Sequence, residues 1–180
     1  HQFINAGIAA ICAQNLPGLS IANNALAHGL RSVYWPGRLQ KLDKGRLVNT
    51  LPPSWEIWLD GGHNAAAANA LAKTVSHWSD RPLHLIFGAL AVRAPQEFLA
   101  PLARDADYLQ AIAIPGESTT LDADVAASAA QKAGHKALPA ASVDAALETI
   151  AKMEKRPGRV LICGSLYLVG AVLAKNETPP

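Results

Sequence analysis

The sequence predicts an α/β fold in which a mainly parallel sheet is covered by helices on both faces. From about residue 56 to the end, short apolar segments alternate with amphipathic ones, and glycine turns or capping residues separate them. Strands buried on both faces read as continuous apolar runs, and crossover helices between parallel strands produce this alternation. The expected strands cover residues 56–60, 83–88, 108–114, 135–138 and 159–163.

The segments between these strands have helical spacing and helix-capping residues. An alanine-rich stretch follows Gly61-Gly62, Asp122 stands near the start of another segment, and Ser142 can cap a third. Side-chain oxygens at such positions accept hydrogen bonds from the first free amides of a helix. The expected helices run over about 64–78, 95–104, 121–133, 142–154 and 166–175.

The first 35 residues have a different pattern. Residues 2–15 predict a mostly apolar helix, which Pro17-Gly18 ends, and Ser20 is expected to cap a second helix over about 21–29 that stops at Gly29. Two helices alone cannot bury so apolar a surface, so we expect it to pack on another domain or chain.

A border between two parts of the chain is predicted near Trp35-Pro36. The Pro-Gly pair at 36–37 breaks the helical pattern, and residues 38–50 carry short extended stretches that favour a hairpin. The expected organisation is a helical segment over 1–35 and an α/β domain over 36–180.

Composition excludes several classes of function. The 180 residues are 50% hydrophobic and 17% charged, with a net charge of +2, so neither nucleic acid nor a membrane surface is an expected partner. No segment has the roughly 18 apolar residues of a membrane helix, and no signal peptide is recognisable. Cys12 and Cys163 both lie in apolar runs, which predicts buried free thiols in a reducing compartment. The chain begins at His1 rather than Met, as expected of a processed or excised fragment.

Ligands of open α/β sheets bind at the carboxyl ends of the strands. This rule selects the loops Asp60–Asn64, Gly88 onward, Pro115–Ser118 and Gly164-Ser165. Asp60 can accept a hydrogen bond from a ribose hydroxyl, and His63 and Asn64 begin a helix whose free amides favour an anion. The equal alternative is that Asp60 and Asn64 only close and cap the turn.

Three further positions have two readings each. Arg38, after Pro36-Gly37, can reach a phosphate or be an ordinary surface residue. Asn5, in an apolar helix, is either a satisfied buried amide or a reader of a base edge. Ser165 begins a helix and, with Tyr167 nearby, can bind a carboxylate, but nothing indicates a nucleophile. The other histidines lack metal-ligand spacing, and we expect no metal site in this chain.

Four motifs together resemble the folylpolyglutamate and dihydrofolate synthases of the Mur-ligase superfamily. They are His1-Gln2-x-x-Asn5-Ala6, Trp35-Pro36-Gly37-Arg38-Leu39-Gln40, Leu59-Asp60-Gly61-Gly62-His63-Asn64 and Gly164-Ser165-Leu166-Tyr167-Leu168-Val169-Gly170. The resemblance implies a Rossmann-like C-terminal domain over 36–180, preceded by the last two helices of a central ATPase domain over 1–35. It also implies a monomeric cytoplasmic ligase with ATP and Mg²⁺ as cofactors, which adds L-glutamate to dihydropteroate or folates through an acyl phosphate.

The resemblance further implies roles for individual residues. ATP would be bound by Asn5 at the adenine, Arg38 at the phosphates, and Asp60 at the ribose with His63 beside it. The incoming glutamate would be placed by Ser165 and Tyr167, with help from His63, which is also the possible catalytic residue. No Gly-x-x-x-x-Gly-Lys-Ser/Thr loop occurs in the chain. The phosphate loop and metal ligands would therefore belong to the N-terminal ATPase domain, and the chain alone would be inactive.

Two departures from the family pattern stand out. Gly62 and Ala65 replace an alanine and a proline, a change that should keep the turn. The Lys-Asp pair common after Phe87-Gly88 is missing, although Arg93 can supply the positive charge. Alternative hypotheses are a non-catalytic binding module of the same fold and a fragment of a Mur-type cell-wall ligase, which the Trp-Pro-Gly-Arg and Gly-Ser-Leu-Tyr motifs disfavour.

Overall fold

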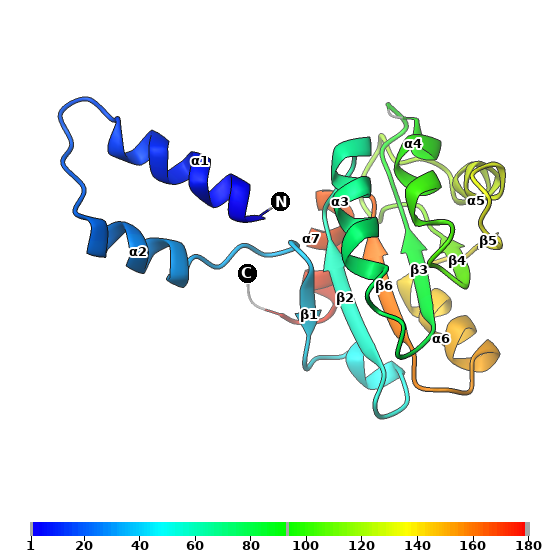
Figure 1. Ribbon diagram of the computed structural model, residues 1–180. Coiled ribbons are helices and arrows are strands. Elements are labelled where there is room, and N and C mark those ends of the chain that lie inside the picture. The colour runs from blue at the N-terminus through cyan, green and yellow to red at the C-terminus, as the bar shows by residue number, and fades with distance from the viewer. Residues whose placement is uncertain (1, 93, 179–180) are drawn as a thin grey trace. The chain divides into compact units, whose positions relative to one another are not determined.

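A computed structural model describes residues 2–92 and 94–178 (Figure 1). The chain divides into two compact units, His1–Trp35 and Pro36–Pro180. That the first unit is the end of an ATPase domain remains a prediction.

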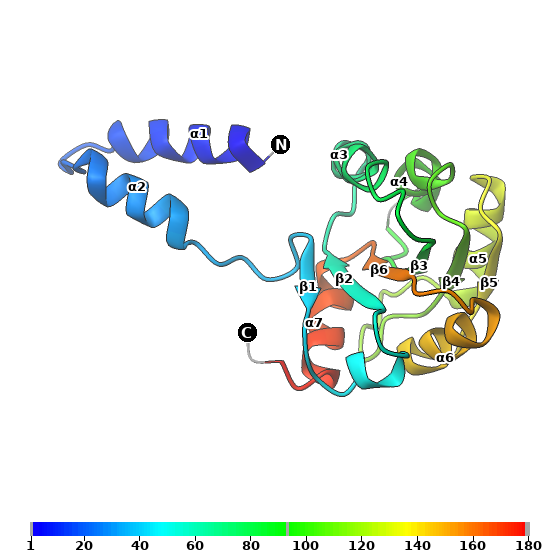
Figure 2. The same ribbon diagram turned by 60° about the horizontal axis from the view of Figure 1, so that its bottom comes forward.

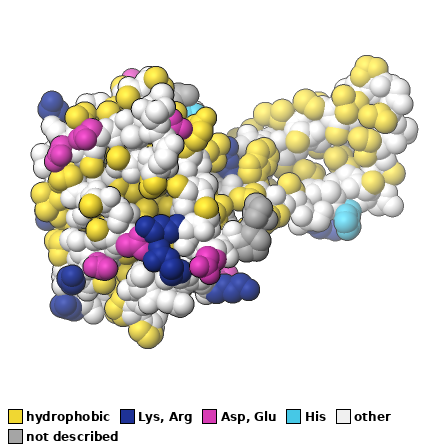
Figure 3. Space-filling view, turned by 180° about the vertical axis from the view of Figure 1, so that it is seen from behind, with side chains coloured by type: hydrophobic (Ala, Val, Ile, Leu, Met, Phe, Trp, Pro, Cys, Tyr) yellow, Lys and Arg dark blue, Asp and Glu magenta, His cyan; other side chains and the backbone are white. Residues whose placement is uncertain are grey.

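The first unit consists of α1 (Gln2–Gln14) and α2 (Asn23–Ser32). Neither helix has a buried residue, and Phe3 is 95% exposed. Figure 3 shows hydrophobic atoms spread over the face of this unit that is in view. The prediction that Cys12 is buried is wrong, because α1 has no packing partner within its unit that covers the thiol.

The predicted bounds of the second helix are also wrong. Ala22, not Ser20, is the N-cap, and its side chain makes no capping hydrogen bond. The helix continues through Gly29 to Ser32, and the N–H of Val33 donates to the Gly29 carbonyl. Glycine inside an exposed helix costs only about 1 kcal/mol relative to alanine, so it need not end one.

The second unit is built on a six-stranded sheet in the order β1-β2-β6-β3-β4-β5. β1 is antiparallel to β2, and the other neighbouring strands are parallel. This confirms the predicted α/β fold with a mainly parallel sheet. The strands are β1 (Gln40–Leu42), β2 (Glu56–Asp60), β3 (Leu83–Phe87), β4 (Tyr108–Ala111), β5 (Ala137–Pro139) and β6 (Arg159–Cys163).

Helices cover both faces of the sheet (Figure 2). One face carries α3, α4 and α5, and the other carries α6, α7 and the short 3-10 helix η1. Their bounds are α3 (Ala65–Val75), α4 (Pro95–Leu99), α5 (Ala123–Lys132), α6 (Val143–Met153), α7 (Leu166–Lys175) and η1 (Val48–Thr50). A second 3-10 helix, η2 (Ala100–Leu102), follows α4 directly.

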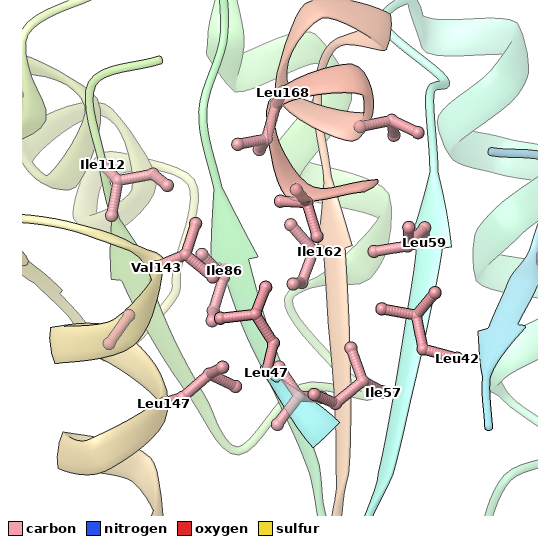
Figure 4. Close-up of a cluster of buried hydrophobic side chains, with 14 of the residues drawn as sticks. Leu42, Leu47, Ile57, Leu59, Ile86, Ile112, Val143, Leu147, Ile162 and Leu168 are labelled. Atoms are coloured by element: carbon pink, nitrogen blue, oxygen red, sulfur yellow. The ribbon is translucent and has the colours of Figure 1, made fainter. Parts of the chain in front are cut away.

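A hydrophobic core lies on each side of the sheet. Figure 4 shows the core under α6 and α7, which contains Ile86 of β3, Ile162 of β6 and Leu147 of α6. The opposite core includes Leu85, Phe87 and Leu161, so alternate residues of one strand serve different faces. Burial on both faces explains why these strands read as unbroken apolar runs.

The hairpin predicted within 38–50 is wrong. The only strand in that stretch is β1, and its antiparallel partner is β2, with Lys41 opposite Trp58. The intervening chain forms η1 because Leu47 and Leu51 turn inward to the core. The helix predicted over 95–104 is likewise divided between α4 and η2, since Pro101 cannot donate a backbone hydrogen bond.

Several predicted helix starts are confirmed. The Asp122 side chain accepts from the amides of Asp124 and Val125, and the Ser142 side chain accepts from the Ala145 amide.

Within the described residues, no helix is long and apolar enough to cross a membrane.

Candidate functional site

The loops that follow β2, β3 and β6 meet at the carboxyl edge of the sheet. A side chain at Gly61 would collide with Leu166, the first residue of α7. A Cβ at Gly164, where φ is +112°, would lie 2.6 Å from Phe87 and 2.7 Å from the carbonyl oxygen of Gly88. Glycines are therefore required here because the three loops approach so closely.

Asp60 closes the turn after β2. Its Oδ1 accepts from the Gly62 amide at 2.8 Å, and its Oδ2 accepts from the Leu39 amide at 3.0 Å. Burial raises the pKa of this carboxyl above its ordinary value, while the two amides and the charge of Arg38 act to lower it. Asp60 therefore closes the turn, as one of the two alternatives predicted. Each of its oxygens still has a second lone pair that can accept another hydrogen bond.

The loop that carries Arg38 is attached to the same turn. The Gly61 amide donates to the Gly37 carbonyl at 2.7 Å, and the Gly37 amide donates to Oε1 of Gln40 at 2.9 Å. Arg38 is exposed, yet its charge is close enough to influence Asp60. The structure therefore brings together two of the residues predicted to bind ATP.

His63 lies beside this turn and lines a pocket of about 240 Å³. It is half-buried, and its Nδ1 is 3.4 Å from the Gly61 carbonyl oxygen. Asn64 caps α3, because its side chain accepts from the Ala67 amide. The pocket is lined by His63, Asn64, Val92, Ala94, Glu97 and Phe98. Arg93 lies outside the described residues, so its role remains a prediction.

Ser165 and Tyr167 begin α7 but differ in exposure. Ser165 is buried, and its Oγ accepts from the Tyr167 amide at 3.1 Å. Tyr167 is exposed and lines a groove of about 550 Å³ together with Pro115, Glu117 and Gly170. The strand-end rule had selected the loop that contains Pro115 and Glu117, and Gly170 ends the fourth motif, but no site role had been predicted for Glu117 or Gly170.

A family model described as "Dihydrofolate synthetase, C-terminal domain" matches residues 46–175, which is most of the chain. The chain belongs to this family. The motifs quoted from the sequence had indicated the same assignment, and the mainly parallel sheet is the fold that goes with it.

Curated relatives carry names consistent with the family. The probable bifunctional folylpolyglutamate synthase/dihydropteroate synthase of Halobacterium salinarum is 32% identical over 175 residues, which cover 94% of this chain and 19% of that protein. The dihydrofolate synthase/folylpolyglutamate synthase of Bacillus subtilis is 28% identical over 178 residues, which cover 96% of this chain and 38% of that protein. The chain therefore spans about a fifth to two fifths of these relatives.

A solved structure has the same fold over the full chain. Folylpolyglutamate synthase of Mycobacterium tuberculosis, complexed with ADP and AMPPCP, superposes with a TM-score of 0.81 at 25% identity and covers 100% of this chain and 41% of that one. The nucleotides are ligands of that protein.

The remaining site predictions for this dihydrofolate synthetase domain concern Asn5 and metal. Asn5 belongs to the first unit, where its side chain is exposed on α1, and both alternatives for it stay predictions. Within 2–92 and 94–178, no group of three or more His, Cys, Asp or Glu side chains could hold a metal ion.

Proposed function

We propose that this chain is the C-terminal part of a cytoplasmic ATP-dependent ligase that joins L-glutamate to dihydropteroate or folates. Membership of the dihydrofolate synthetase family supports the reaction class. The observation that carries the nucleotide role is Arg38 next to Asp60 at the carboxyl edge of the sheet, where α/β proteins bind ligands.

The nucleotide would use three residues of the second unit. Arg38 is exposed and would reach the phosphates with its forked donors. A second lone pair on an Asp60 oxygen would accept from a ribose hydroxyl, and His63 would lie beside the nucleotide. Asn5 would contact the adenine.

The incoming glutamate would bind at the start of α7. Its carboxylates suit free helix amides and hydroxyl donors. The Ser165 Oγ already accepts one amide, but its O–H can still donate, and Tyr167 presents an exposed hydroxyl and ring. His63 would complete this site from the neighbouring turn.

In the proposed reaction, ATP phosphorylates the substrate carboxylate to an acyl phosphate. The amine of L-glutamate attacks the acyl carbon, an amide bond forms, and phosphate leaves. The residues named here would contribute positioning and charge neutralisation, which dominate in phosphoryl transfer. The family resemblance implies Mg²⁺ as a partner of the phosphates, but among the described residues no group of three or more His, Cys, Asp or Glu side chains could hold a metal ion.

The nucleotide role can be tested with the chain as it stands. Titration with ADP, followed through backbone amide chemical shifts, should perturb Gly37, Arg38, Gly61 and Gly62. Arg38→Ala should weaken ADP binding about tenfold or more, because a charged hydrogen bond is lost, and Arg38→Lys should weaken it less. The matched control is Arg104→Ala, which removes an exposed arginine from another edge of the sheet. The nucleotide role is wrong if ADP shifts none of these amides.

A further inference from the structure

The loop that carries Arg38 has left-handed backbone on both sides of the arginine, and this conformation is strained at Leu39. Gly37 has φ of +70° and Leu39 has φ of +47°. Glycine adopts this left-handed region freely, but a branched residue such as leucine pays roughly 1–2 kcal/mol there. Such backbone persists only where the surrounding structure over-determines it.

Two side chains hold the backbone in this conformation, one on each side of Arg38. Gln40 accepts from the Gly37 amide through Oε1 at 2.9 Å. Asp60 accepts from the Leu39 amide through Oδ2 at 3.0 Å. Neither hydrogen bond belongs to a sheet ladder or a helix, so both act on the loop specifically.

The loop also contacts the turn after β2 and helix α7. The Gly37 carbonyl accepts from the Gly61 amide, and a Cβ at Gly37 would lie 2.6 Å from Cγ1 of Val169 on α7. Asp60 binds the Gly62 amide with its other oxygen, so one carboxylate connects the loop and the turn after β2. Gly61 in turn lies against Leu166.

We infer that Gln40 and Asp60 are positioning residues, which hold Arg38 in register with the turn that starts α3. The inference rests on the proposed nucleotide role of Arg38. It adds to that proposal a function for Gln40 and a second function for Asp60, beyond contact with a ribose.

Substitutions of Gln40 test the first part. Gln40→Met keeps the length of the side chain and removes the acceptor, whereas Gln40→Glu keeps an acceptor oxygen. In the nucleotide-free chain, Gln40→Met should raise amide hydrogen exchange at Gly37 and Leu39 about tenfold, and should weaken ADP binding about three- to tenfold, as expected for one lost hydrogen bond. Gln40→Glu should restore both properties in large part.

Lys41→Met is the matched control for Gln40. Lys41 is the next residue of β1, and its ammonium pairs with Glu56 near the other end of β2. It should change neither amide exchange at residues 37–39 nor ADP affinity. Thermal unfolding of every variant, monitored by circular dichroism, identifies any general loss of fold.

Asp60→Asn tests the second part. A carboxamide has only one acceptor oxygen, so either Leu39 or Gly62 loses its partner. Exchange at one of these amides should rise without nucleotide present, an effect that a purely ribose-binding Asp60 would not produce. Unchanged exchange at both amides removes Asp60 as a positioning residue.

These experiments distinguish a failure of the positioning inference from a failure of the proposed nucleotide role. If Arg38→Ala leaves ADP binding unchanged, the proposed nucleotide role fails. If Arg38→Ala weakens binding while Gln40→Met matches the unsubstituted chain in exchange and affinity, only the positioning inference fails. The inference is also overturned if Gln40→Glu is as damaging as Gln40→Met, because the acceptor would then be irrelevant.

Discussion

Gly37 shows how one residue serves both backbone geometry and packing. It is buried, its φ is +70°, and the space where a Cβ would stand is occupied by Val169. Both features limit the position to glycine. The Pro-Gly pair had predicted a break in the chain here, but not the close approach to α7.

Gly37→Ala should destabilise the chain by about 2–3 kcal/mol, from left-handed backbone strain plus the contact with Val169. The control is Gly116→Ala, where φ is +75° but no atom lies within 4 Å of the added Cβ. That variant should lose only about 1 kcal/mol. Urea unfolding measures both, and equal losses would mean that the contact with Val169 has no energetic effect.

Two buried histidines are expected to make stability depend on pH. His84 stacks on Trp55, with ring centroids 5.9 Å apart, and neither ring nitrogen has a hydrogen-bond partner among the described residues. Burial lowers the pKa of His84, although the charges of Asp107 and Glu154 oppose this effect. Burial likewise lowers the pKa of His135, against the hydrogen bond with the Leu99 carbonyl.

The unfolded chain therefore takes up protons that the folded chain resists. Stability should be independent of these groups well above their ordinary pKa of about 6.5, and should fall as the pH drops below it, by at most about 1.4 kcal/mol per pH unit for each histidine. Urea midpoints at pH 7.5 and 5.5 measure the effect. His84→Phe keeps the ring and should reduce the loss, so an undiminished loss would exclude His84 as its source.

At the scale of elements, one buried side chain connects two segments distant in sequence. Asn176, directly after α7, is fully buried. Its Oδ1 accepts from the Leu47 amide at 2.9 Å, and its Nδ2 donates to the Lys44 carbonyl at 2.9 Å. These bonds hold the segment before η1 against α7, which explains why residues 38–50 do not form the expected hairpin.

Asn176→Ala should destabilise the chain by about 2–4 kcal/mol, because a buried amide and a carbonyl lose their partners. Asn69→Ala is the control, since Asn69 is an exposed residue of α3 that donates only to its own helix, and its loss should stay within about 0.5 kcal/mol. Chemical unfolding followed by tryptophan fluorescence measures the difference. Similar values for both variants would contradict a role for Asn176 in joining the two segments.

For the whole molecule, the two units differ in how their apolar residues are covered. The buried hydrophobic residues described all lie in Pro36–Pro180, whereas α1 and α2 bury none. The chain also spans only 19% and 38% of two relatives. Both facts fit a C-terminal part that works together with a further domain, as proposed.

We predict that this chain by itself shows no glutamate-dependent ATP turnover. The sequence lacks a Gly-x-x-x-x-Gly-Lys-Ser/Thr phosphate loop, so in the proposed reaction the cradle for the transferred phosphate would come from elsewhere. Phosphate release in the presence of ATP, Mg²⁺, L-glutamate and dihydropteroate measures this. Clear turnover above a glutamate-free control would overturn the view that the chain is catalytically incomplete.

The sequence by itself determined the α/β class, the five parallel strands along the chain and the family. Hydrophobic periodicity and capping residues such as Ser142 report local burial and local hydrogen bonds, which a short stretch of sequence contains. Only the tertiary structure decided that β1 pairs with β2, and that Asp60 binds the amide of Leu39, a residue 21 positions away. Such pairings depend on which segments the sheet order brings together, and no local pattern encodes that order.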